Sequence, residues 1–155
     1  YSSIADAPEN LIPGLYWWAT NHSYYLFSRP VIERINNREL LEVIMHRINS
    51  LNPDYYYGGT SRFFGRLYTR LPGVDISKSE QYFNQAISNH PDYFGNSVQM
   101  AEFYHQKKGN REFFHKQLIE VINKDPYDYP ISFPENIFYQ KYAKYLIENE
   151  AALFE

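Results

Sequence analysis

The sequence contains no cysteine. This absence excludes disulfide bonds, thiolate metal sites and cysteine nucleophiles, but it leaves the compartment open, because an oxidising compartment permits disulfides without requiring them. The chain also lacks a basic excess, since its net charge is -3 and its 15 lysines and arginines are scattered. Nucleic acid is therefore not an expected partner. No apolar run approaches the roughly 20 residues that a membrane-spanning helix requires.

Aromatic residues, in contrast, are abundant. They make up 19% of the 155 residues, with 16 tyrosines and 11 phenylalanines. A tyrosine ring buries a large apolar area while its hydroxyl still faces water or a polar partner. We therefore expect a tyrosine-rich core, an aromatic-lined groove, or both, in a chain whose length suits a single domain.

An internal period is visible in three segments that end in Pro53, Pro91 and Pro126, which are 38 and 35 residues apart. Counting back eight and five residues from each proline gives an apolar pair every time: Met45 and Ile48, Phe83 and Ala86, and Leu118 and Val121. Tetratricopeptide units run about 34 residues and are helical hairpins that bury their apolar faces by stacking on one another. The spacing therefore predicts stacked hairpins, although the residue identities match the repeat only loosely.

The apolar periodicity predicts helices throughout the chain and no sheet. The expected helices lie near residues 13–28, 38–51, 58–70, 77–89, 94–107, 111–124 and 133–148. Asn110 is predicted to cap the sixth helix, and Gly109 to end the fifth in a left-handed conformation. Ser132 and Glu135 have the spacing of a capping box. The predicted fold class is all-α, a tetratricopeptide-like helical-hairpin solenoid of about seven helices.

Two aromatic-rich segments carry a resemblance to a known family. They are Leu15-Tyr16-Trp17-Trp18-Ala19-Thr20-Asn21 and Tyr57-Gly58-Gly59-Thr60-Ser61-Arg62-Phe63-Phe64-Gly65. With Leu71-Pro72-Gly73, Ala86-Ile87, Pro91, Pro134-Glu135-Asn136 and Ala143, the chain resembles the T component family associated with tripartite ATP-independent periplasmic (TRAP) transporters. The resemblance covers roughly residues 11 to 147.

The resemblance implies a non-enzymatic periplasmic accessory component without a cofactor. Such a protein has an apolar cleft, works beside the solute-binding protein of the transporter and handles a hydrophobic small molecule. Because the chain begins at Tyr1 and lacks the family's lipid-attachment cysteine, residues 1–155 are expected to be one domain, the C-terminal part of a longer lipoprotein. Its only membrane contact would then be a lipid anchor upstream. The protein is a possible homo-oligomer, and the sequence does not determine its oligomeric state.

Eight residues in these segments are candidate ligand-binding residues: Tyr16, Trp17, Asn21, Tyr56, Gly58, Gly59, Arg62 and Phe63. A helical glycine costs up to about 1 kcal/mol relative to alanine, so the glycine pair indicates either a cavity wall or close helix packing and a turn. Arg62 can hold a carboxylate through two hydrogen bonds, or it can brace the helix. Successive helical residues turn by about 100°, so at least one ring of residues 16–18 must point away from the core. Asn21 is a candidate for interhelical hydrogen bonding.

Two other functions are compatible with parts of the sequence. A general tetratricopeptide adaptor would grip a peptide in an open polar groove without a deep pocket. A di-metal carboxylate enzyme would use the two Glu-x-x-His segments, residues 102–105 and 112–115, because this spacing places both ligands on one helix face. Both segments flank the predicted turn at Gly109, however, where solvent reaches, and no phosphate loop, zinc motif or nucleophile turn accompanies them.

Overall fold

The computed structural model of the chain describes residues 1–155 and contains helices but no strands. The long helices are α2 (Ile12–Phe27), α3 (Val31–Leu51), α4 (Tyr55–Thr69), α5 (Ser77–Asn89), α8 (Arg111–Ile122) and α9 (Phe133–Glu148). A further continuous helical run is formed by α6 (Phe94–Gln99), the π-helix η2 (Met100–His105) and α7 (Gln106–Lys108). Short elements complete the chain: α1 (Ser2–Ala5), η1 (Glu9–Leu11), η3 (Pro126–Asp128) and α10 (Glu150–Leu153). The predicted all-α class is confirmed.

The predicted helix positions agree with the structure except at the start of α3. This helix begins at Val31, directly after Pro30, and not near residue 38. Asn36 and Asn37 have low helix propensity, so the local preference at this point is against a helix. Tertiary contacts reverse that preference, because Arg34 donates hydrogen bonds to the carbonyl oxygen of Leu26 in the last turn of α2 and to that of Arg29 in the loop after it.

The predicted caps are confirmed at one turn and wrong at another. Asn110 accepts a hydrogen bond from the Phe113 backbone N–H, and Gly109 has φ 68°. Ser132 does not cap α9, because its hydroxyl donates to the carbonyl oxygen of Asp92 at 3.0 Å. Glu135 does not complete a capping box either, since its Oε1 accepts a hydrogen bond from the Tyr56 hydroxyl at 3.4 Å.

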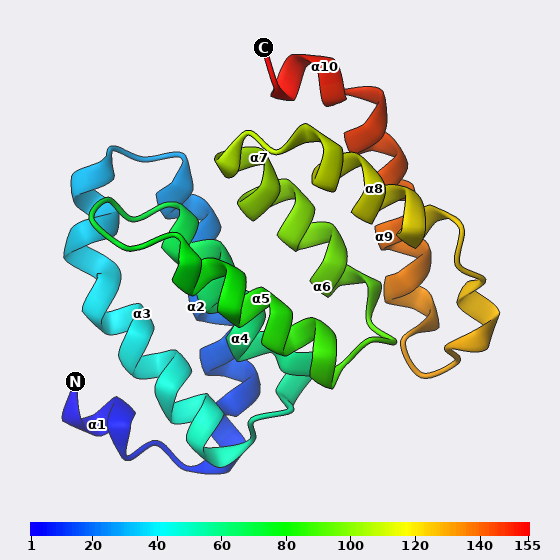
Figure 1. Cartoon of the computed structure of the whole chain (residues 1–155). Coiled ribbons are helices and arrows are strands. Elements are labelled where there is room, and N and C mark those ends of the chain that lie inside the picture. Colours follow the sequence, from blue (N-terminus) through cyan, green and yellow to red (C-terminus); the bar gives the residue numbers. More distant parts are fainter.

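Consecutive helices pack against each other in the predicted pairs: α2 contacts α3, α4 contacts α5, and η2 contacts α8. Figure 1 shows α2 to α5 grouped on one side of the molecule and α6 to α9 on the other. Each group has its own apolar core, one around Leu41, Met45 and Phe63, the other around Phe94 and Leu118. All three apolar pairs found from the repeat are buried. A regular superhelical stacking of the pairs stays a prediction.

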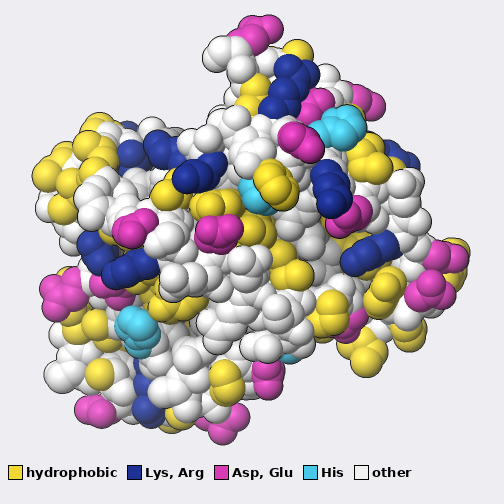
Figure 2. All heavy atoms as spheres, viewed as in Figure 1, with side chains coloured by type: hydrophobic (Ala, Val, Ile, Leu, Met, Phe, Trp, Pro, Cys, Tyr) yellow, Lys and Arg dark blue, Asp and Glu magenta, His cyan; other side chains and the backbone are white.

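A third, smaller cluster joins the two groups. Phe83 from α5 packs with Met100, Phe103 and Tyr104 from η2. On the surface, acidic and basic side chains are interspersed on the face that Figure 2 shows. None of the helices combines the length and apolarity that crossing a bilayer requires.

Candidate functional site

The site begins with an irregular turn at the start of α4. Tyr56, Tyr57 and Gly58 have φ values of 49°, 59° and 76°, so three successive residues are left-handed. A left-handed backbone costs a non-glycine residue roughly 1–2 kcal/mol, and only the third position here is a glycine. Other contacts must therefore stabilise the turn.

Arg62 supplies those contacts from one turn further along α4. Its Nη2 donates to the carbonyl oxygen of Tyr56 at 3.0 Å and its Nη1 to that of Tyr57 at 3.1 Å. The same two nitrogens donate to the Tyr16 hydroxyl at 2.9 Å and to Asn96 Oδ1 at 2.8 Å. The side chain is 2% exposed. Arg62 thus fixes the turn to both α2 and α6, which matches the bracing role considered for it.

Asn96 strengthens this arrangement from the side of α6. Its Nδ2 donates to the carbonyl oxygens of Tyr57, Ala86 and His90, at 3.2, 3.2 and 3.3 Å. Asn96 is fully buried, and its amide adds to the bonds that these acceptors receive from Arg62 and from backbone N–H groups. These contacts connect the left-handed turn to the C-terminal end of α5 and to His90 just beyond it.

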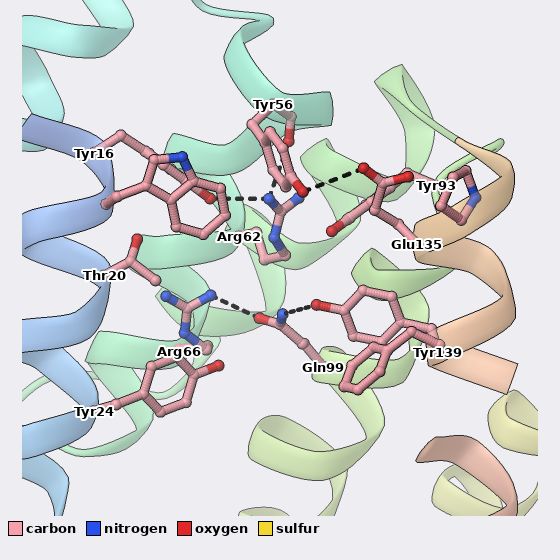
Figure 3. Close-up of a pocket in the computed structure, with 13 residues that line it drawn as sticks. Tyr16, Thr20, Tyr24, Tyr56, Arg62, Arg66, Tyr93, Gln99, Glu135 and Tyr139 are labelled. Atoms are coloured by element: carbon pink, nitrogen blue, oxygen red, sulfur yellow. Dashed lines mark hydrogen bonds between the residues drawn. The ribbon is translucent and has the colours of Figure 1, made fainter. Parts of the chain in front are cut away.

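A pocket of about 400 Å³ opens beside this turn, between the two groups of helices (Figure 3). Its wall comes from α2, α4, α6, α9 and the residue preceding α6. The lining residues are Tyr16, Trp17, Thr20, Tyr24, Tyr56, Arg62, Arg66, Tyr93, Gln99, Pro134, Glu135, Phe138 and Tyr139. More than half of them are aromatic, and the volume lies within the range typical of small-molecule sites.

The aromatic rings differ in their access to solvent. Tyr16 and Tyr93 are 1% and 3% exposed and form the inner wall. Trp17 and Phe138, by contrast, are 41% and 59% exposed, so they border the opening. Trp17 packs edge-on against Tyr56, with ring centroids 4.9 Å apart. The pocket therefore has an aromatic mouth as well as an aromatic interior.

The pKa values of three tyrosine hydroxyls in the pocket wall are raised. Burial, together with the neighbouring Glu135 carboxylate, raises the pKa of Tyr56 to about 12. Burial also raises the pKa of Tyr93 and that of Tyr24, although Arg66 partly opposes the latter shift. The charged groups of the wall are therefore two guanidinium groups and one carboxylate.

Four of the eight candidate residues line the pocket: Tyr16, Trp17, Tyr56 and Arg62. Asn21, Gly58, Gly59 and Phe63 lie outside its wall. The interhelical role considered for Asn21 is wrong, because its amide donates to the carbonyl oxygen of Trp17 in its own helix. Phe63 is completely buried in the core of the first helical group.

Gly58 and Gly59 affect the pocket without lining it. Gly58 occupies the third left-handed position of the turn. At Gly59, a Cβ atom would lie 2.7 Å from the ring of Tyr16, so only glycine lets this ring reach Arg62. The close-packing and turn interpretation of the pair describes these contacts: Gly59 makes room for the Tyr16 ring, whereas Gly58 allows the left-handed turn close to Ala86 and His90.

The sequence did not identify several residues of the pocket wall, among them Arg66 and Gln99. Gln99 links two elements, since its Oε1 accepts from Arg66 Nη1 at 2.7 Å and its Nε2 donates to the Tyr139 hydroxyl at 2.9 Å. The spacing of four between Arg62 and Arg66 was an available signal, because it places both arginines on one face of α4. Gln99 and Tyr139 gave no such signal, since only the packing of α6 against α9 brings them together.

The two Glu-x-x-His segments are directed toward different partners. Glu102 accepts a hydrogen bond from the Tyr142 hydroxyl, whereas His115 is hydrogen-bonded to Glu150 at 3.1 Å. No group of three or more His, Asp or Glu side chains is arranged to hold a metal ion. The structure thus does not bring these segments together as a di-metal site.

The fold and the pocket define a class of all-α proteins that enclose an aromatic cavity between helical hairpins. Within that class, the chain belongs to the TRAP transporter T-component family, whose sequence model matches residues 2–154. A comparison with individually curated proteins gives no significant match. Family membership confirms the resemblance seen in the sequence, and it makes the protein a transport accessory component of a TRAP transporter system.

Proposed function

We propose that the protein binds a hydrophobic small molecule in the aromatic pocket as its task within the transporter system. The observation that carries this proposal is the wall itself, in which rings from α2, α4 and α9 surround about 400 Å³. Burying apolar ligand surface against such rings provides the main favourable free energy of binding. The partly exposed rings of Trp17 and Phe138 give the ligand a way in.

The same geometry argues against the peptide-adaptor alternative. That function needs an open polar groove with amide or cationic clamps along its length. Here the amide of Asn96 and the guanidinium of Arg62 are already engaged by carbonyl oxygens of the chain. These two groups therefore stabilise the fold and do not act as clamps for a bound peptide.

Replacing Trp17 with alanine tests the proposal. We expect the free energy of unfolding to fall by only about 1 kcal/mol, because the ring is 41% exposed and packs mainly edge-on. Affinity for a hydrophobic ligand should fall about tenfold, since one face of the pocket mouth is lost. Native mass spectrometry of protein purified from its own host measures the retained ligand, and chemical denaturation measures stability.

Trp18→Ala is the matched control for this experiment. Trp18 is 49% exposed and lies on the same helix, but it stacks on His22 and does not line the pocket. Ligand retention by this variant should equal that of the unaltered protein. Consistent recovery of empty protein, or equal losses in both variants, would contradict a hydrophobic ligand in this pocket.

We also propose that the partner is the solute-binding protein of the transporter, in the periplasm, with the chain held at the membrane by a lipid anchor. Family membership fits a periplasmic location. An exposed aromatic row on α2 favours a protein contact there: Trp18 stacks on His22, which stacks on Tyr25. Aromatic residues are enriched in protein interfaces.

Co-purification with that solute-binding protein tests the partner. We expect Trp18→Ser combined with Tyr25→Ser to reduce the amount retained at least about tenfold, because interface aromatics often carry about 2 kcal/mol or more. Tyr127→Ser is the control, since this tyrosine is 77% exposed and lies far along the chain from α2. Failure of the unaltered protein to retain the solute-binding protein would refute the partnership.

A further inference from the structure

A second, smaller pocket lies where α3 begins and where α4 and α7 end. Its volume is about 300 Å³, and seven residues line it. Three of them are the cations Arg34, Arg70 and Lys107, and none is acidic. This basic pocket is a local concentration of positive charge on a chain whose net charge is -3.

The two guanidinium groups of the basic pocket are fixed in position but keep free donors. Arg34 Nη1 donates to the carbonyl oxygens of Phe27 and Arg29, at 3.4 and 3.1 Å. The Cζ of Arg70 lies over the rings of Phe27 and Phe103, 6.0 and 5.3 Å from their centroids. The Nε atoms of both arginines are fully buried, whereas Arg34 Nη2 and both Nη atoms of Arg70 form no hydrogen bond and remain accessible. An anion that enters the pocket can therefore reach three guanidinium nitrogens.

Neighbouring groups of the protein do not balance these charges. None of the ion pairs of the structure includes Arg34, Arg70 or Lys107. Burial and the like charge of Arg34 lower the pKa of the Arg70 guanidinium; Glu102 opposes this shift, but it accepts a hydrogen bond from Tyr142. The C-terminal ends of α2, α4 and α7 carry roughly half a negative charge each, and the start of α3 roughly half a positive one. Against three full positive charges, this leaves an excess of about two.

An apolar surface, the apolar tip, borders the basic pocket. It consists of Val31, Ile32 and Ile35 in the first two turns of α3, which are 43%, 55% and 45% exposed. Val31 belongs both to this tip and to the pocket wall. In Figure 2, hydrophobic side chains gather where α2 leads into α3, and Lys and Arg side chains lie next to them. This combination is typical of surfaces that bind anionic membranes, where apolar side chains enter the interface and cations contact the lipid head groups.

We infer that the basic pocket binds the phosphate group of an anionic phospholipid while the apolar tip enters the lipid surface. Phosphate suits the pocket, because converging cations can contact several of its oxygen atoms at once. A soluble phosphate would leave the apolar tip in water, so the exposed side chains favour a lipid as its source. The inference is independent of the aromatic pocket. It adds a second membrane contact to the proposed lipid anchor, and a single acyl chain by itself gives only reversible binding.

Co-sedimentation of the full chain with vesicles tests the inference. Phosphatidylcholine vesicles are compared, at low ionic strength, with vesicles in which about one third of the lipid is phosphatidylglycerol. The unaltered chain should bind the anionic vesicles at least about tenfold more strongly. Lys107→Gln should weaken this binding about fivefold, and Arg70→Gln combined with Lys107→Gln about thirtyfold. Ile32→Ser should weaken it about threefold or more and leave the preference for anionic vesicles in place.

Lys141→Gln combined with Lys144→Gln is the matched control, because it makes the same change in net charge on α9, in the other group of helices. Its vesicle binding should stay within about twofold of that of the unaltered chain. Equal binding to both kinds of vesicle, binding to neither, or equal losses in the two double variants would overturn the inference. Calorimetric binding of soluble glycerol 1-phosphate without vesicle binding would overturn the lipid as the occupant. Should Arg70→Gln fail to fold, Lys107→Gln alone still decides the question, because Lys107 is exposed.

Discussion

Replacing Arg62 with methionine is expected to lower the free energy of unfolding by about 3 kcal/mol or more. The substitution keeps the apolar stem but removes the donors that serve two backbone carbonyl oxygens, the Tyr16 hydroxyl and Asn96. Each buried acceptor left without a donor costs about 1–3 kcal/mol. In addition, the left-handed backbone at Tyr56 and Tyr57 loses the group that holds it.

Urea denaturation measures this effect, and Arg29→Met serves as its control. Arg29 is exposed, lies between α2 and α3 and pairs with Glu33 in the first turn of α3, so its replacement should change stability by less than about 0.5 kcal/mol. A loss below about 1 kcal/mol for Arg62→Met would show that Asn96 alone maintains the turn. The bracing role of Arg62 would then be refuted.

Replacing Phe83 with alanine is expected to cost about 3–5 kcal/mol, because the ring is fully buried where α5 meets both α4 and η2. Its close neighbour is Gly65, where a Cβ atom would lie 2.7 Å from the ring. Gly65→Ala alone should therefore cost about 1–3 kcal/mol through overpacking. In the double variant the cavity left by Phe83 accepts the added methyl group.

The combined loss should consequently be smaller than the sum of the single losses by about 1 kcal/mol or more. Thermal and urea denaturation of the four proteins give this coupling. Gly14→Ala is the control, since no atom lies within 4 Å of its added Cβ, and it should stabilise the protein by up to about 1 kcal/mol. Strict additivity of Phe83→Ala and Gly65→Ala would contradict the direct contact.

The helical architecture could be predicted because its signals are local. The apolar pairs such as Phe83 and Ala86 repeat at helical spacing, and the turn at Gly109-Asn110 carries its own terminator and cap. These features depend on residues a few positions apart, which interact in any chain that becomes helical. Even so, the cap assigned to Ser132 was wrong, since a carbonyl oxygen forty positions away competes for its hydroxyl.

The pocket could be predicted only in part. The aromatic residues of α2 and the segment around Arg62 were recognisable as unusual, and four of the candidates line the cavity. Arg66, Gln99 and Tyr139 were not recognisable, because their roles depend on contacts between α4, α6 and α9. Nor does the sequence alone indicate which arginine keeps unused donors.

The sequence by itself determined that this protein is built from helices, roughly where each begins and ends, and to which family it is similar. Only the tertiary structure decided that the guanidinium of Arg62 donates to the carbonyl oxygens of Tyr56 and Tyr57. The Nε and Nη2 of Arg66, one turn further along α4, have no hydrogen-bond partner. The physical reason is that helix formation follows from short-range periodicity, whereas the availability of a charged group depends on every long-range partner that reaches it.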